Sequence, residues 1–246
     1  MKKILSLFLV CLSLIACDEK KNENTLVVAT SADYPPFEFY KDGKIVGFEI
    51  DLITAIAKEL KKEIVIKDMS FDGIIGGLQS GRIDVAISAI SETSDRKEKV
   101  DFTAPYHRTM SVMLVGKESP ITKPNDLASK SVGVQMGTTY EKMIKEEWQP
   151  VISNMSLRSL SKVPDLIQDY KSGRLDAIVL GVSEAESIVK TYPELKIIPL
   201  PSTEAVYAIA LPKGSPLTEK INEIIKKWHT DGTLKKIQDA WLSPKE

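Results

Sequence analysis

The chain has few of the residues that most often carry metal, redox or acid–base chemistry. Its 246 residues include two cysteines, Cys11 and Cys17, and two histidines, His107 and His229. Neither histidine stands in a Ser–His–Asp or HExxH context, and no glycine-rich phosphate loop is present. We therefore expect no disulfide in the folded part, no metal site, no cofactor and no catalytic centre.

The chain also lacks an excess of basic charge. Lys and Arg number 33 against 34 Asp and Glu. If Lys2 and Lys3 are removed with an N-terminal signal, 31 basic residues face 34 acidic ones, a net charge of −3. Nucleic-acid-binding proteins present a basic surface, so nucleic acid is not an expected partner.

The N-terminus predicts export. Residues 4–15 are almost entirely apolar and follow two lysines, and this run is short for a membrane span, so residues 1–16 are predicted to be a secretory signal. The end of this segment, Leu14-Ile15-Ala16-Cys17, resembles a bacterial lipobox, in which the cysteine becomes a lipid-bearing N-terminus. The alternative is an ordinary signal with a chance cysteine. Residues 17–24 are charged and predict a flexible tether. The expected location is the cell envelope, anchored by lipid to a membrane and facing the periplasm or the exterior.

One short phrase occurs twice. SGRIDVAIS begins at Ser80 and SGRLDAIVL at Ser172, 92 residues later. In each copy the glycine ends a predicted helix (71–79 and 163–170) and the apolar run forms a predicted strand (83–88 and 175–180). The repeat favours two related lobes, although similar helix-to-strand turns also arise by coincidence.

The remaining pattern alternates strands with helices and predicts an α/β protein with parallel sheets. Further strands are predicted over 26–29, 64–66, 132–135 and 205–211, and further helices over 48–60, 139–147, 183–191, 217–229 and 234–241. Because ligands bind outside the carboxyl ends of the strands in such sheets, the residues after each strand are the candidate site.

The segment after the strand at 83–88 has the chemistry of a carboxylate site. Asp95 and Glu98 have capping-box spacing, which predicts a helix that begins there. Arg96 in its first turn can grip a carboxylate with two parallel hydrogen bonds, and Ser88 and Ser91 add hydroxyl donors. The alternative is a solvent-facing arginine in a charged run.

Other polar and aromatic side chains follow the other strands. Thr138 also has capping-box spacing, here with Glu141, and it lies beside Gln135 and Thr139. A plain helix cap is the alternative for this segment. Tyr34 and Phe71 can flank a ligand or pack into the core.

These segments together resemble a known family. Its motifs appear here in order as TSADYPPFEF, GKIVGFEIDL, FDGIIGGLQSGRIDVAIS, SDRKEKVDFTAPY, VGVQMGTTYE and SGRLDAIVL. The chain resembles the extracellular polar-amino-acid-binding proteins of bacterial ABC importers (solute-binding family 3). The resemblance implies a two-lobed, periplasmic-binding-protein-like (type II) α/β fold with a ligand cleft and a two-strand hinge. It also implies lobe 1 at residues 25–110 and 205–246, and lobe 2 at residues 111–204.

The resemblance also implies residue roles. Arg96, Ser91 and Thr139 match contacts to the ligand α-carboxylate, and the Ala89 carbonyl matches an acceptor for the α-amino group. Tyr34 and Phe71 match rings that flank the ligand side chain, and Gln135 and Thr138 match the wall of lobe 2. The implied protein is a monomer that captures an amino acid and delivers it to a membrane permease.

Two positions depart from the family pattern. Gly181 stands where many relatives place an acid that takes the ligand ammonium, and Glu184 or a water is a candidate substitute. Ser31 stands where several relatives carry Asp, with Asp33 and Glu38 nearby. The motifs TSADYPPFE and VGVQ favour arginine or lysine as the ligand. The alternatives are a cyclohexadienyl-acid dehydratase, which the loss of the acid keeps open, and a sensor domain.

Overall fold

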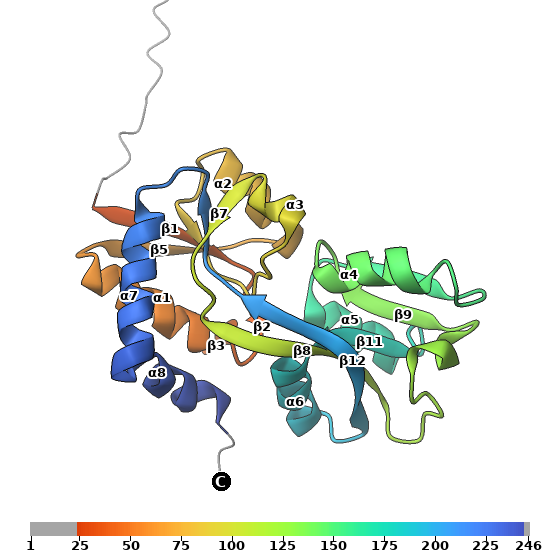
Figure 1. Cartoon of the computed structure of the whole chain (residues 1–246). Coiled ribbons are helices and arrows are strands. Elements are labelled where there is room, and N and C mark those ends of the chain that lie inside the picture. The colour runs from red at the N-terminus through yellow and green to blue at the C-terminus, as the bar shows by residue number, and fades with distance from the viewer. Residues whose placement is uncertain (1–23, 244–246) are drawn as a thin grey trace, which may run out of the picture.

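The computed structural model describes residues 24–243, with the side chains of residues 202 and 203 left aside. The predicted signal at 1–16, Cys17 and nearly all of the tether at 17–24 lie outside the described residues. Figure 1 shows two lobes, each with a β-sheet flanked by helices. The predicted α/β architecture with two lobes is confirmed.

The first lobe contains a five-stranded sheet in the order β5-β1-β6-β13-β7. β1 (Thr25–Thr30) lies parallel to β5 (Glu63–Asp68) and β6 (Val85–Ala86), and β13 (Ala210–Pro212) runs antiparallel between β6 and β7 (Val100–Phe102). Its helical segments are α1 (Phe48–Glu59), η1 (Phe71–Gly73), α2 (Ile74–Gln79), α3 (Ser94–Lys97), α7 (Leu217–Asp231) and α8 (Thr233–Leu242). A small antiparallel sheet of β2 (Asp33–Tyr34), β3 (Glu38–Lys41) and β4 (Lys44–Val46) adjoins it.

The second lobe contains a sheet in the order β10-β9-β11-β8-β12. β9 (Ser131–Gln135) lies parallel to β10 (Ser156–Leu160) and β11 (Ala177–Gly181). Its helical segments are η2 (Pro124–Leu127), α4 (Thr139–Met143), the π-helical η3 (Ile144–Trp148), α5 (Val163–Lys171) and α6 (Val182–Thr191). As predicted for strands that alternate with helices, β9, β10 and β11 are parallel.

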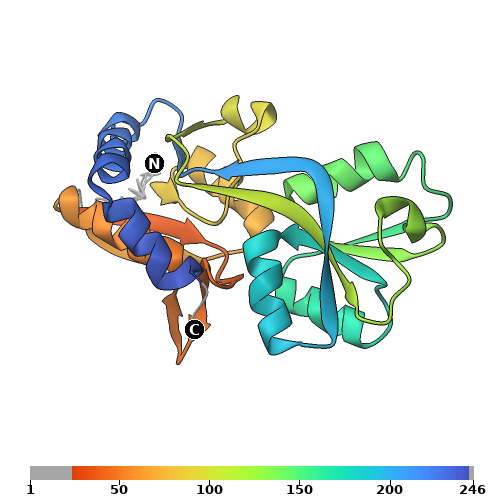
Figure 2. The same ribbon diagram turned by 60° about the horizontal axis from the view of Figure 1, so that its bottom comes forward.

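Two long strands connect the lobes. β8 (His107–Gly116) and β12 (Leu195–Tyr207) pair antiparallel from His107 opposite Tyr207 to Gly116 opposite Leu195. The register is irregular between Pro199 and Glu204. Figure 2 shows both strands crossing from one lobe to the other, as expected for the two-strand hinge. The lobe boundaries at 110/111 and 204/205 stay predictions.

The repeated sequence forms an equivalent turn and an equivalent hydrogen bond in each lobe. Gly81 and Gly173 adopt left-handed φ angles of 69° and 72°, which end the preceding helices. Asp84 Oδ2 accepts a hydrogen bond from Val27 N at 2.9 Å, and Asp176 Oδ2 accepts one from Ser131 N at 2.9 Å. The aspartate of each copy therefore ties the phrase to the neighbouring parallel strand, which explains its presence in both.

Several predicted bounds were wrong. The strand expected at 83–88 spans only Val85–Ala86, since Ala89 turns left-handed at φ 48° and the chain leaves the sheet. The strand expected at 205–211 is divided between the end of β12 and β13. Asp95 is not a helix cap, because Thr93 caps α3 and accepts from Arg96 N at 3.3 Å.

Candidate functional site

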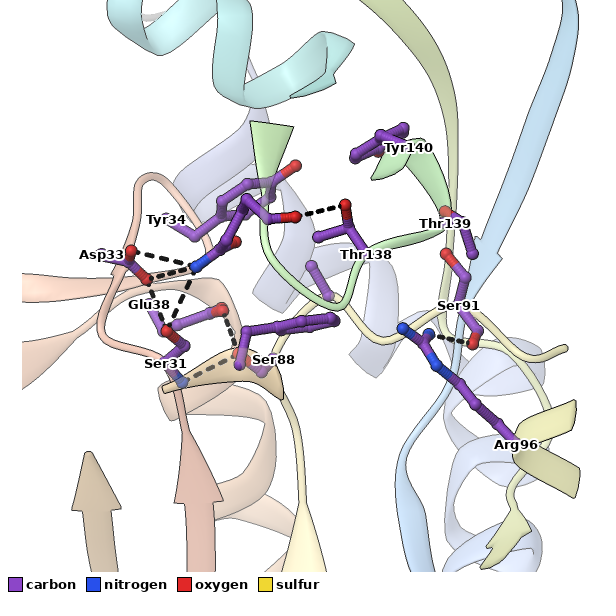
Figure 3. A pocket seen from close by; sticks show the side chains of 13 residues that line it. Ser31, Asp33, Tyr34, Glu38, Ser88, Ser91, Arg96, Thr138, Thr139 and Tyr140 are labelled. Atoms are coloured by element: carbon purple, nitrogen blue, oxygen red, sulfur yellow. Dashed lines mark hydrogen bonds between the residues drawn. The ribbon is translucent and has the colours of Figure 1, made fainter. Parts of the chain in front are cut away.

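A pocket lies between the two lobes where β1, β6 and β9 end. It is lined by Ser31, Asp33, Tyr34, Glu38, Phe71, Ser88, Ala89, Ser91, Arg96, Gln135, Thr138, Thr139 and Tyr140. All nine residues predicted from the sequence to contact ligand are in this set, and Figure 3 shows most of them converging. The structure therefore brings the predicted residues together, while their roles toward a ligand stay predictions.

Arg96 projects from α3 and spans the gap between the lobes. Its guanidinium donates to Ser91 O at 2.6 Å and to Gly137 O of lobe 2 at 2.9 Å, and it lies 5.4 Å from the centre of the Phe71 ring. Burial lowers the pKa of Arg96 to about 10. Among the described residues no acidic side chain pairs with it, so Arg96 is a partly buried cation available to an anion.

The wall of lobe 2 is the turn between β9 and α4. Thr138 caps α4 by accepting from Glu141 N at 3.3 Å, and Glu141 Oε2 accepts from Gly137 N at 2.7 Å. The predicted cap at Thr138 is therefore present, but the capping box is not complete, because Glu141 accepts from Gly137 N and not from Thr138 N. Thr139 and Tyr140, at the start of α4, face the pocket from this turn.

Buried carboxyl groups lie on the other side of the pocket from Arg96. Glu38 Oε1 accepts from Ser88 Oγ at 2.8 Å, whereas its Oε2 has no hydrogen-bond partner among the described residues. Glu49 lies behind and accepts from Ala89 N at 2.9 Å and from Tyr106 Oη at 2.5 Å. Burial, and for Glu38 also its neighbour Glu49, raises the pKa of both carboxyl groups. Figure 3 shows Glu38 and Arg96 on opposite sides.

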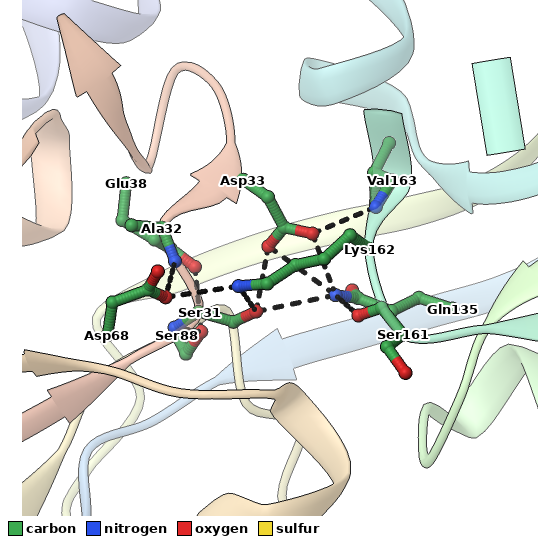
Figure 4. A network of polar contacts seen from close by, with 10 residues as sticks. All are labelled: Ser31, Ala32, Asp33, Glu38, Asp68, Ser88, Gln135, Ser161, Lys162 and Val163. Atoms are coloured by element: carbon green, nitrogen blue, oxygen red, sulfur yellow. Dashed lines mark hydrogen bonds and ion pairs between the residues drawn. The ribbon is translucent and has the colours of Figure 1, made fainter. Parts of the chain in front are cut away.

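Asp33 joins the lobes to each other. Its Oδ2 accepts from Val163 N, at the start of α5, at 2.8 Å and from Gln135 Nε2 at 3.2 Å. Nearby, Lys162 of lobe 2 forms an ion pair with Asp68 of lobe 1 at 3.0 Å (Figure 4). Burial raises the pKa of Asp33, although these hydrogen bonds and Lys162 oppose the rise.

The lobes are closed. The pocket has a cavity volume of about 20 Å³, which is room for about one water molecule. Lys142 also pairs with Asp95 across the cleft at 2.5 Å. A ligand larger than water therefore enters only when the lobes separate.

Gly181 faces three tyrosines. A Cβ atom placed on it would lie 2.9 Å from the Tyr207 hydroxyl and 3.2 Å from those of Tyr140 and Tyr34. Its backbone N donates to Tyr34 Oη at 3.1 Å. The space that an acidic side chain at position 181 would need is therefore filled by phenol groups.

Four pocket residues were not among the predicted ligand contacts, although the sequence analysis noted Ser31, Asp33 and Glu38 near the site. Ser31, Asp33 and Glu38 belong to the loop and strands after β1, and Tyr140 follows the predicted Thr139. Their position after strand ends was the available signal. It did not reveal which side chains of each segment point inward.

Residues 24–243 contain neither a cluster of metal-ligand side chains nor a membrane-spanning helix. No group of three or more His, Cys, Asp or Glu side chains there could hold a metal ion. Within the same range, no helix combines the length and apolar character needed to cross a membrane.

Comparison with known proteins identifies the family. Residues 26–244 match the model of the bacterial extracellular solute-binding proteins, family 3. The chain belongs to this family. It is 34% identical over 254 residues to the arginine-binding extracellular protein ArtP of Bacillus subtilis, covering 99% of both chains. It is 35% identical over 227 residues to the L-cystine-binding protein TcyJ of Escherichia coli, covering 90% of this chain and 84% of TcyJ.

The fold agrees with this membership. An ancestral arginine-binding protein bound to arginine superposes with a TM-score of 0.85 at 40% identity, covering 89% of this chain and 99% of that one. These relatives are binding proteins and not enzymes. The family assignment and the non-enzymatic class predicted from the sequence are thereby confirmed.

Proposed function

We propose that this solute-binding protein captures a basic L-amino acid, arginine or lysine, between its lobes. The observation that carries the proposal is the distribution of charge in the pocket. Arg96 offers an unpaired cation on one side, and Glu38 offers a buried carboxyl with a free oxygen on the other. An amino acid with a carboxylate at one end and a cation at the other complements both.

The relatives support the choice of ligand without deciding it. ArtP and the ancestral protein bind arginine, whereas TcyJ binds cystine. The acidic side of the pocket favours the basic ligand. We propose the delivery partner to be an ABC permease, with the protein monomeric and held at the membrane by lipid on Cys17. No feature of the pocket favours a dehydratase over a binding protein.

The proposal is tested by thermal unfolding of the purified protein with each of the twenty amino acids, ornithine, citrulline and cystine. A ligand that binds only the folded state raises the melting temperature. We expect the largest rise with arginine or lysine. A largest rise with cystine or a neutral amino acid contradicts the basic ligand, and no rise with any contradicts amino-acid binding.

Arg96→Ala tests the carboxylate site. Loss of a buried charge partner costs roughly 2–5 kcal/mol, so we expect affinity for the ligand to fall about 100-fold or more by calorimetry. Arg108→Ala is the matched control, because Arg108 is an exposed arginine that pairs with Glu204 on β12. Equal affinities of the two variants would show that Arg96 does not bind the carboxylate.

A further inference from the structure

Glu184 is a buried acid without a basic partner among the described residues. It lies in the first turn of α6, three residues after Gly181, and is 0% exposed. Neither carboxyl oxygen makes a well-formed hydrogen bond among the described residues, although the Tyr34 hydroxyl is placed as a donor to this carboxyl group. A buried polar group left unpaired costs free energy of folding, so its presence calls for a function.

Three tyrosine hydroxyls lie near both Gly181 and this acid. Those of Tyr34, Tyr140 and Tyr207 surround the Cβ position of Gly181, and Tyr140 Oη lies 3.3 Å from Tyr207 Oη. Tyr34 and Tyr140 also line the pocket, whereas Glu184 does not. Burial raises the pKa of all three tyrosines, and the proximity of Glu184 adds to the rise for each.

A phenol can link a cation to a carboxylate. Its oxygen accepts a hydrogen bond from an ammonium group while its own hydrogen is donated to an acid. Such chains strengthen one another where water is excluded. Two tyrosines that line the pocket with a free carboxyl behind them therefore form an acceptor for a cation, although the pocket wall itself has no acid at Gly181.

We propose that Glu184 is the counter-ion of the ligand's α-ammonium group and acts through the hydroxyls of Tyr34 and Tyr140. Glu184 is thus a positioning residue that determines specificity for an amino acid over the same acid without its amine. The inference rests on the proposed function, because it requires a ligand that carries an α-amine.

The ionisation of Glu184 supplies a second signature. Burial raises the pKa of Glu184 well above its usual range, an effect that Asp33 strengthens and Tyr34 opposes. The groups facing it are Tyr34, Tyr140, Tyr207 and Asp33. An arriving ammonium favours the carboxylate, so the carboxyl proton leaves to solvent as the ligand binds.

The test compares matched ligands on wild type and Glu184→Gln. The pairs are L-arginine with 5-guanidinopentanoate and L-lysine with 6-aminohexanoate, which differ only in the α-amine. We expect wild type to prefer the amino acid, and Glu184→Gln to lose at least about tenfold of that preference while melting at or above the wild-type temperature without ligand. Tyr140→Phe should lose part of the preference and provides a second variant.

Calorimetry in buffers of different ionisation enthalpy counts the released protons. We expect wild type to release more protons than Glu184→Gln on binding the same amino acid at pH 7. An unchanged preference together with equal proton release overturns the role of Glu184 and leaves the proposed function standing. Failure of wild type to bind any amino acid overturns the proposed function itself.

Discussion

At the scale of the residue, Gly181 determines what the second lobe presents to the pocket. The missing side chain leaves room for the hydroxyls of Tyr34, Tyr140 and Tyr207, all within 3.2 Å of the Cβ position. These hydroxyls terminate rigid rings whose bodies are buried in the core. Even a methyl group at position 181 would therefore have to displace them.

Gly181→Ala is expected to destabilise the protein by about 1–3 kcal/mol through overpacking. Gly76→Ala is the matched control, because Gly76 is an exposed residue in α2 with nothing within 4 Å of its Cβ position. That control should be neutral or stabilise by roughly 0.5–1 kcal/mol. Urea unfolding measures both, and a Gly181→Ala midpoint at or above that of wild type would contradict the packing argument.

At the scale of the element, the connecting strands meet in an aromatic cluster. His107, at the start of β8, lies 5.3 Å from the ring centre of Phe37 and 5.8 Å from that of Tyr207 at the end of β12. Its Nε2 is buried without a hydrogen-bond partner among the described residues. Burial lowers the pKa of His107 from 6.5 to about 4. The base of the hinge is therefore held by a neutral histidine.

The stability of this cluster should depend on pH. The unfolded chain binds a proton at His107 near pH 6.5 but the folded chain only near pH 4, so stability is lost as pH falls through that window. His107→Phe should remove this loss, which is about 2 kcal/mol at pH 5.

The measurement is the difference in unfolding free energy between variant and wild type at pH 7 and at pH 5. The raised pKa values of Glu38, Glu49 and Glu184 change the stability with pH in the opposite direction. Their contributions are the same in variant and wild type, so they cancel in this difference. A difference that stays constant with pH would show that His107 does not resist protonation.

At the scale of the whole molecule, closure depends on close contact between backbones. Gly137 of lobe 2 has a left-handed φ of 79°, and a Cβ on it would lie 2.9 Å from Cα of Asp72 in lobe 1. Gly173 has a similar φ of 72° but nothing within 4 Å. Substituting either glycine would therefore strain the left-handed backbone, but only Gly137 lies at the lobe interface.

Gly137→Ala should impede closure. We expect it to weaken ligand affinity by about tenfold or more, because closure becomes less populated. Gly173→Ala should keep the affinity of wild type, while both variants lose roughly 1 kcal/mol of stability from the left-handed backbone. Calorimetry gives the affinities, and small-angle scattering with ligand should show a larger radius for Gly137→Ala alone. Equal affinities would contradict the contact with Asp72.

Much of this protein follows from its sequence. The helices at 48–60 and 217–229 were predicted to within two residues, because their apolar side chains recur at helical spacing. The repeated sequence predicted equivalent turns in the two lobes. Its glycines end the helices and its aspartates bind the neighbouring strand in both copies. The nine predicted pocket residues lie together because the carboxyl ends of parallel strands gather at one edge of a sheet.

Only the tertiary structure determined which partners the acidic side chains have and how deeply they are buried. Asp33 binds the start of α5, 130 residues away, and Tyr34 binds Gly181, 147 residues away. In the sequence, Glu184 is an ordinary acid in the first turn of a predicted helix, but the fold buries it near three tyrosines. Local pattern specifies helices, strands and turns, whereas the charge and partners of a buried group depend on residues that only folding brings near it.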